Sequence, residues 1–317
     1  MAKDTVASGL GYWIACLVNF DRERDIALAN QRHDDGAPPT AEVAPIRKIR
    51  ARGGVEMPAL GLGTWTMGEK GSRRKQEIAA LRLGFDLGMT MVDTAEMYAD
   101  GGAEEVVAEA VRGCRDEVFI VTKVLPENAS YEGTIKAAER SLRRIGTDRI
   151  DLYLLHWKGP HPVEQTLEAF ERLVQGHKIR HYGVSNFYVA DMEAAERHPL
   201  GPGIAVNQVK YNLTQRGIEG DLLPWCIERQ AAVMAYSPVN QGRLTVKRAL
   251  TAVARRHDTT PECVALAWTL RQPMVVSIPK SANPDHVRTN ARAVTLDLSK
   301  EDLEALDRDY PPAGRGV

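Results

Sequence analysis

Four side chains of different chemistry end or follow short apolar runs in the first half of the chain. Asp93 ends one run, Tyr98 lies five residues further on, and Lys123 and His156 each end a later run. An ammonium beside a phenol lowers the pKa of the phenol, and a carboxylate holds the ammonium charged and in place. An imidazole can donate a hydrogen bond to an oxygen that gains charge in a transition state. The set predicts a proton donor beside an oxyanion site, which suits the reduction of a carbonyl.

Each of these residues also has a structural interpretation when it is taken alone. An aspartate at a strand end often caps a helix or forms a structural ion pair, and a lysine there often extends to solvent. His156 precedes Trp157 and is compatible with a packed core histidine. Their joint placement at the ends of successive apolar runs favours one shared site.

From residue 46 onward, strand-like and helix-like stretches alternate. The strand-like runs are 59–62, 91–93, 118–123, 152–156, 179–185, 205–208, 233–236 and 275–279. The helix-like stretches centre on 73–88, 103–113, 132–145, 163–175, 188–197, 217–229, 246–257 and 284–292. This alternation predicts parallel βαβ units, and its size matches an α/β fold of the (β/α)8 TIM barrel type. The active site of such a barrel lies at the C-terminal ends of its strands, where adjacent strands are about 4.8 Å apart.

An open, doubly wound sheet is the alternative architecture. Its dinucleotide-binding form needs a third glycine after the first strand, whereas Gly61-Leu62-Gly63 is followed by Thr64-Trp65-Thr66. Two further segments suggest additions to a barrel. Residues 46–52 and 55–60 flank Gly53-Gly54 and predict a β-hairpin that caps the N-terminal mouth. Helical patterns at 261–271 and 299–309 predict extra C-terminal helices outside the eightfold repeat.

The first 45 residues differ from the rest. Apolar residues at helical spacing between 10 and 18 suit a short docking helix, and breakers follow at 34–39. A poorly ordered extension is the equal alternative, because termini are ordered only where they are tied down. We therefore expect an N-terminal extension at 1–45 and one barrel domain at 46–317.

Composition excludes several classes of protein. The 317 residues carry a formal net charge of −1, so no general basic face for nucleic acid is expected. No stretch of about twenty apolar residues predicts a membrane span. The four cysteines show no CxxC or His/Cys ligand spacing, so we expect no metal site and a reduced, cytoplasmic protein. A monomer or a weak homo-oligomer is expected.

Several segments together resemble the aldo-keto reductases. They are 84–95 followed by Glu96-Met97-Tyr98, Val121-Thr122-Lys123, 151–157, Gly183-Val184-Ser185-Asn186-Phe187 and Ile278-Pro279-Lys280-Ser281. The resemblance runs from about Met57 to Tyr310 and keeps the motif order. Segments 96–104 and 222–226 are most similar to bacterial members that reduce methylglyoxal and related dicarbonyls.

The resemblance implies a role for each matching residue. Tyr98 would be the proton donor, tuned by Lys123 and Asp93, and His156 would orient the carbonyl. The nicotinamide would be held by Asp93, Ser185, Asn186 and Gln208 and stacked on Tyr236. The rest of the cofactor would meet Gly63, Thr64, Trp65, Ser237, Pro238, Val239, Lys280, Ser281, His286 and Asn290. Trp65 and Trp157, with Phe187 as a further candidate, would wall a pocket for a small carbonyl substrate beside Tyr98 and His156. For each aromatic, ordinary barrel packing is the alternative.

The chain departs from the family pattern at the phosphate end of the cofactor. Lys280 and Ser281 would meet the 2′-phosphate of NADPH, since an ammonium and a hydroxyl suit a dianion. Many members have arginine where this chain has His286 and glutamate where it has Thr289. Arg288 would point elsewhere on a helix. NADPH is the expected cofactor, and NADH stays open. The short join at 242–246 predicts looser clamping of the nucleotide.

Other functions compete with carbonyl reduction. Lys123 at a barrel strand end suits a Schiff-base aldolase, although a nearby Asp93 would keep it charged. Metal-dependent hydrolysis has less support, since His156 and His161 lack a third histidine ligand. A non-catalytic, NADPH-binding redox-sensing subunit is a non-enzymatic alternative, and the complete set of four residues argues against it.

Overall fold

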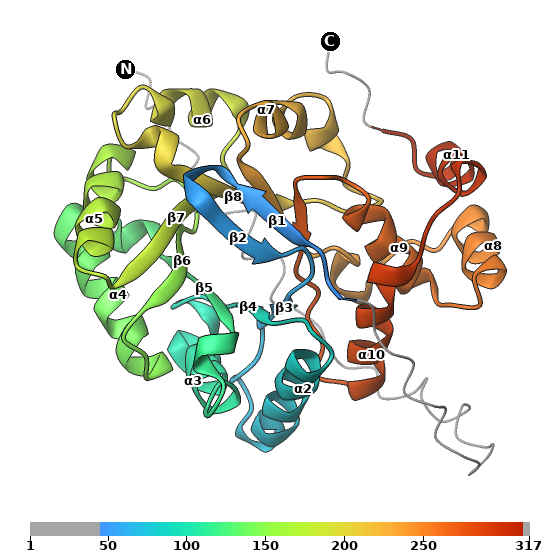
Figure 1. Ribbon diagram of the computed structural model, residues 1–317, viewed down its shortest axis with the longest axis horizontal. Helices are drawn as coiled ribbons and strands as arrows, with labels where there is room; N and C mark the ends of the chain where they lie inside the picture. Colours follow the sequence, from blue (N-terminus) through green and yellow to red (C-terminus); the bar gives the residue numbers. More distant parts are fainter. Residues whose placement is uncertain (1–44, 313–317) are drawn as a thin grey trace, which may run out of the picture. The chain divides into compact units, whose positions relative to one another are not determined.

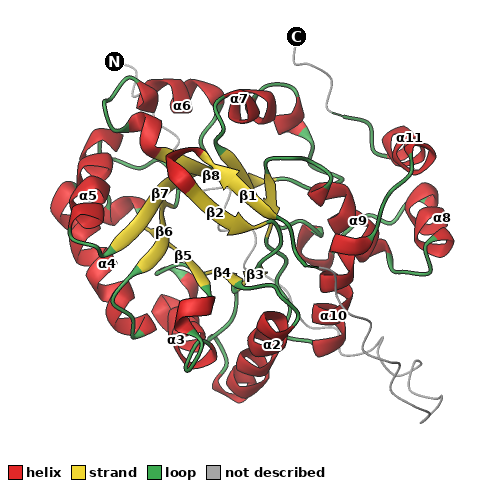
Figure 2. Cartoon of the chain, viewed as in Figure 1, coloured by secondary structure: helices red, strands yellow, loops and turns green. Residues whose placement is uncertain are grey.

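An eight-stranded parallel sheet forms the centre of the protein. The structure is a computed structural model that describes residues 45–312, so the predictions for the terminal extension lie almost wholly outside the described residues. The strands follow one another in chain order around the sheet (Figure 2). They are β3 (Leu62–Gly63), β4 (Met91–Asp93), β5 (Phe119–Val124), β6 (Ile150–Leu155), β7 (Ile179–Ser185), β8 (Ile204–Lys210), β9 (Ala232–Tyr236) and β10 (Val275–Ser277).

Contacts between the first and last strands close this sheet into a barrel. Leu60 forms a parallel bridge with Ser277, and the amide of Gly61 donates to the carbonyl of Ser277 at 2.9 Å. The amide of Gly63 donates to the carbonyl of Pro279 at 3.0 Å. A Cβ atom at Gly63 would lie 2.9 Å from the carbonyl oxygen of Ile278, so the closing contact requires glycine there. The predicted (β/α)8 barrel is confirmed.

Helices surround the barrel (Figure 1). They are α2 (Arg74–Asp86), α3 (Gly102–Ala110), α4 (Tyr131–Ile145), α5 (Val163–Gln175), α6 (Val189–Glu196), α7 (Leu222–Glu228), α8 (Arg248–Arg256), α9 (Pro261–Leu270), α10 (Pro284–Arg292) and α11 (Lys300–Asp309). The boundaries agree with the sequence pattern to within a few residues, apart from a shorter α7 than predicted.

One helix occupies a different place from the one expected. The pattern placed residues 246–257 in the eightfold ring and 261–271 outside it. In the structure α9 contacts β10, whereas α8 packs on α9 and α11. All residues from 263 to 270 are buried, because α9 is covered by the sheet on one side and by other elements on the other. A helix that is apolar all round belongs inside a protein, so α9 is the ring helix and α8 is an addition.

The predicted N-terminal hairpin covers the end of the barrel opposite the strand C-termini. Strands β1 (Lys48–Ala51) and β2 (Val55–Pro58) pair antiparallel. The side chain of Arg52 donates from Nε to the carbonyl of Ile204, the first residue of β8, at 2.6 Å. Its amide donates to the carbonyl of Gln230, just before β9, at 2.7 Å. These bonds tie the hairpin to the N-terminal strand ends and leave the other end to the site.

Most strand residues are buried, because helices cover one face of the sheet and the barrel interior covers the other. Every residue of β6 is buried, for example, including Asp151 and Tyr153. Among residues 45–312, no helix is long and apolar enough to cross a membrane.

Candidate active site

A buried ion pair lies at the centre of the C-terminal strand ends. Asp93 is the last residue of β4, and Lys123 lies one residue before the end of β5. Lys123 Nζ donates to Asp93 Oδ1 and Oδ2, both at 2.8 Å, and to the carbonyl of Thr94 at 2.7 Å. Lys123 is fully buried, and Asp93 is 3% exposed. The ammonium thus has three acceptors, one for each of its protons, and the predicted pairing of Asp93 with Lys123 is confirmed.

Tyr98 and His156 lie beside this pair. The Lys123 ammonium lies 5.1 Å from the centroid of the Tyr98 ring. The Tyr98 and His156 rings meet edge to face with centroids 5.8 Å apart. His156 directly follows β6 and is buried, and among the described residues its Nδ1 has no hydrogen-bond partner. The structure therefore brings together all four residues that the sequence singled out.

Burial sets the protonation states of the phenol and the imidazole. The pKa of Tyr98 is raised well above its ordinary value, first by burial and then by the Asp93 carboxylate. The predicted lowering by Lys123 is wrong, because the ammonium is neutralised by Asp93 at hydrogen-bond distance. The pKa of His156 is lowered well below its ordinary value by burial and by the Lys123 charge. At neutral pH the site holds a protonated phenol and a neutral imidazole.

Polar side chains from the later strands form a connected group. Ser185 Oγ donates to the carbonyl of Gln208 at 2.8 Å, and Tyr236 Oη donates to Asn186 Oδ1 at 3.0 Å. Gln208 Nε2 donates to Asp93 Oδ1 at 2.7 Å. The residues assigned to the nicotinamide thus lie together, and Gln208 also bonds directly to the Asp93–Lys123 ion pair.

The aromatic residues near the site differ in exposure. Trp65 follows β3 and is 45% exposed, and the Trp157 ring lies 4.6 Å from that of His156. Phe187 is buried at 1% exposure, so its alternative role in barrel packing is the correct one. Tyr188, which the sequence did not single out, is 77% exposed after β7. Trp65 and Tyr188 therefore present exposed rings at this end of the barrel.

The remaining residues assigned to the cofactor lie at the ends of β3, β9 and β10 or on α10. Thr64 is buried and its hydroxyl donates to the carbonyl of Asp93 at 2.9 Å, so it supports the end of β4. Ser237, Pro238 and Val239 follow β9. Pro238 is buried, and the other two are partly exposed. Gly63 lies against the segment that leads to Lys280.

The β10 end and α10 carry the residues expected at the 2′-phosphate. Lys280 and His286 are exposed, and Asn290 is buried. The pKa of Lys280 is lowered by partial burial, and Arg73 contributes in the same direction. Arg288 lies 3.7 Å from Asp285 on its own helix. This agrees with the expectation that Arg288 does not replace the missing family arginine, whereas Arg73 is a nearby cation that the sequence did not reveal.

Comparisons with known proteins agree with this geometry. The sequence model of the Aldo/keto reductase family matches residues 59–310. The chain belongs to this family. Methylglyoxal reductase YeaE of Escherichia coli (strain K12) is 50% identical over 85% of this chain and 97% of its own. Glyoxal reductase of Bacillus subtilis (strain 168) is 35% identical over 82% of this chain and 91% of its own. An aldo/keto reductase of Klebsiella pneumoniae, crystallised with NADP and acetate, superposes with a TM-score of 0.83 at 49% identity, covering 85% of this chain and 97% of that chain.

As an aldo/keto reductase the chain is an oxidoreductase, and its geometry argues against the competing use of Lys123. A Schiff base requires an accessible amine, but Lys123 is fully buried and bonded to Asp93 and Thr94. Burial lowers the pKa of Lys123, and Asp93 opposes that fall. The buried, hydrogen-bonded amine of Lys123 therefore does not suit a Schiff base.

Sequence reasoning missed two residues that hold the Tyr98 loop, Glu96 and Arg140. Glu96 is a carboxylate two residues before Tyr98, so the sequence offered it as a neighbour of the phenol. Arg140 is 44 residues away from Glu96 and lies on α4, so no local spacing could connect them.

Proposed function

We propose that this aldo/keto reductase uses NADPH to reduce small aldehydes and ketones, methylglyoxal and other dicarbonyls among them, with Tyr98 as proton donor. The observation that carries the proposal is the cluster of Asp93, Tyr98, Lys123 and His156 at one end of the barrel. It combines a protonated phenol, a neutral imidazole and a buried cation, which is the set that a developing alkoxide needs.

The residues present fit a nicotinamide cofactor. Asn186, Ser185 and Gln208 offer amide and hydroxyl groups from adjacent strands, and Tyr236 presents a half-buried ring beside Asn186. When bound, NADPH supplies the hydride. Lys280, with Ser281, offers an ammonium and a hydroxyl for its 2′-phosphate. The charge of Lys280, with Arg73 nearby, favours NADPH over NADH.

The chain's own residues account for the polar half of the reaction. Tyr98 holds its proton at neutral pH because burial raises its pKa, and it gives that proton to the substrate oxygen as the oxygen becomes alkoxide-like. His156, neutral and buried, donates a hydrogen bond to the same oxygen and orients the carbonyl. The Lys123 ammonium lies 5.1 Å from the centroid of the Tyr98 ring, and Asp93 keeps Lys123 in that position while the proton leaves.

The substrate class is supported by the relatives and by the rim of the site. The relatives from Escherichia coli and Bacillus subtilis are named for methylglyoxal and glyoxal reduction. Trp65 and Tyr188, which follow β3 and β7, have exposed rings that offer apolar surface at the C-terminal strand ends, where the Trp157 ring packs on His156. Small carbonyl compounds with a short apolar group suit this aromatic surface.

Steady-state turnover tests the proposal. The purified protein is mixed with NADPH and with methylglyoxal, glyoxal or an aromatic aldehyde, and the loss of nicotinamide absorbance is followed while the alcohol product is identified. We expect alcohol formation in step with NADPH oxidation, fastest with a dicarbonyl. NADPH binding without turnover of any carbonyl would instead support the non-catalytic redox-sensing alternative.

A further inference from the structure

A buried carboxylate ties the loop that carries Tyr98 to the strand that carries Lys123. Glu96 is 8% exposed and lies two residues before Tyr98. Its Oε1 accepts hydrogen bonds from the amide of Leu125 and from Asn128 Nδ2, both at 2.9 Å. The amide of Glu96 donates to the carbonyl of Lys123 at 3.4 Å. Main chain and side chain of Glu96 thus both bind the C-terminal end of β5.

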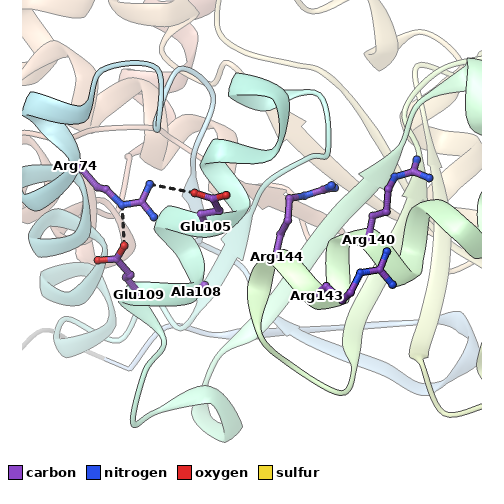
Figure 3. A pocket seen from close by; sticks show the side chains of 7 residues that line it. All are labelled: Arg74, Glu105, Ala108, Glu109, Arg140, Arg143 and Arg144. Atoms are coloured by element: carbon purple, nitrogen blue, oxygen red, sulfur yellow. Dashed lines mark hydrogen bonds and ion pairs between the residues drawn. The ribbon is translucent and has the colours of Figure 1, made fainter.

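Arg140 of α4 completes the coordination of this carboxylate. Its Nη2 donates to the second oxygen of Glu96, Oε2, at 3.1 Å, and its side chain is 39% exposed. Arg140, Arg143 and Arg144 line a groove of about 490 Å³, and Figure 3 shows their side chains. Arg143 lines the same groove but forms no hydrogen bond or ion pair within the described residues. Arg140 and Arg143 thus differ in that Arg140 alone contacts Glu96.

Between Glu96 and α3, the main-chain hydrogen bonds that the described residues donate are local. The amide of Tyr98 closes a turn onto the carbonyl of Ala95 at 3.0 Å. Ala99 and Asp100, which follow, have φ angles of 51° and 52°, a left-handed conformation that costs energy in residues other than glycine. A strained loop keeps one conformation only where its surroundings impose it, and Glu96 supplies the polar anchor next to the phenol.

We propose that Glu96, held by Arg140, is a positioning residue that fixes the phenol of Tyr98 against Lys123 and His156. The inference rests on the proposed role of Tyr98 as proton donor. Loss of the anchor lets the loop shift, and a displacement of about 1 Å of a reacting group costs up to about a hundredfold in rate. Apart from Asp93, the residues assigned to the cofactor lie outside this loop and its strand, so the affinity for NADPH is unaffected.

The first test uses two arginines of one helix. Arg140→Met removes the partner of Glu96 from a half-exposed position, and Arg143→Met removes a neighbouring charge from the same groove. We expect Arg140→Met to lower kcat by about tenfold and to increase the solvent isotope effect, with an unchanged Kd for NADPH. Arg143→Met should keep the wild-type kcat and the wild-type solvent isotope effect. Equal kcat in the two variants would overturn the inference.

The second test uses two buried carboxylates at opposite ends of β5. Glu96→Gln loses the oxygen that accepts from Arg140 but keeps one for Leu125. Asp151 likewise accepts a β5 amide, that of Ile120 at 2.9 Å, together with the guanidinium of Arg115 at 2.9 Å. Because Asp151 lies at the N-terminal end of the barrel, Asp151→Asn should lower thermal stability and leave kcat unchanged. Glu96→Gln should lower kcat by about tenfold.

A double variant and a parallel control separate the outcomes. If Arg140 acts through Glu96, the kcat of Glu96→Gln with Arg140→Met equals that of Glu96→Gln alone; multiplied losses would contradict this. Tyr98→Phe is measured alongside. If Tyr98→Phe loses turnover while Glu96→Gln and Arg140→Met both keep wild-type turnover, only the positioning role is overturned. If Tyr98→Phe retains turnover, the proposed function fails and the positioning role fails with it.

Discussion

Replacement of Asp93 by asparagine should expose the electrostatic cost of the buried lysine. Asp93 accepts from Lys123 at 2.8 Å through both oxygens and from Gln208 at 2.7 Å. Asparagine keeps one acceptor and turns an amino group toward the ammonium. Removal of one partner of a buried ion pair typically costs about 3–5 kcal/mol, because the other charge is left without compensation.

The pH sets an upper limit to this cost. A lysine with an unfolded pKa of about 10.4 can give up its proton on folding, which costs about 1.4 kcal/mol for each pH unit below that value. At about pH 7 the loss is therefore at most about 5 kcal/mol. The folded pKa of Lys123 in the variant is lowered, so the unfolded chain binds the extra proton and the variant gains stability as pH rises. The stability difference between the variant and the wild type stops shrinking at the pH where wild-type Lys123 also loses its proton. The pKa of wild-type Lys123 is itself lowered by burial.

Urea denaturation at several pH values measures this effect. We expect Asp93→Asn to be less stable than the wild type by about 3–5 kcal/mol at about pH 7, with a smaller difference at about pH 9. A double variant with Lys123→Met removes the unpaired charge and should recover most of the loss. A difference below about 1 kcal/mol, or a double variant no more stable than Asp93→Asn, would refute the reasoning.

Three further variants test separate parts of the site. Lys280→Ala should raise the KM for NADPH by about tenfold or more and barely change that for NADH, since a charge-assisted bond to a phosphate contributes about 1.5–3 kcal/mol; equal effects would remove the 2′-phosphate argument. The lowered pKa of His156 means that the unfolded chain binds its proton first, so wild-type stability should fall by up to about 1.4 kcal/mol per unit below about pH 6.5. His156→Gln should lack that part of the slope, and identical profiles would show that His156 does not titrate on unfolding. Trp65→Ala should raise the KM for aromatic aldehydes more than for methylglyoxal, as measured by initial rates; no change for either would place Trp65 outside the pocket.

The fold was predictable from sequence because the period of the pattern changes regularly along the chain. Strands buried on both faces produce continuous apolar runs, and the intervening helices produce amphipathic stretches. The exchange of α8 and α9 was not predictable in this way. Both stretches have helical periodicity, and only the complete burial of α9 against β10 shows which one belongs in the ring.

The chemistry of the site was predictable for residues at strand ends. It was less predictable where tertiary contacts determine a protonation state or a side-chain partner. Asp93, Lys123 and His156 are brought together by strand adjacency, which sequence order already implies. The protonation state of Tyr98 depends on burial and on the neutralisation of Lys123, and neither can be read from spacing. The contact of Glu96 with Arg140 joins a loop to an outer helix, so it appears only in the folded chain.

The central claim, that Tyr98 delivers the proton, is tested most directly by Tyr98→Phe. The change removes one hydroxyl and keeps the ring that packs against His156. With saturating NADPH and methylglyoxal, we expect kcat to fall by about 10²- to 10⁴-fold, while the Kd for NADPH, measured by fluorescence titration, stays within about threefold of wild type. A variant with wild-type kcat would contradict the account.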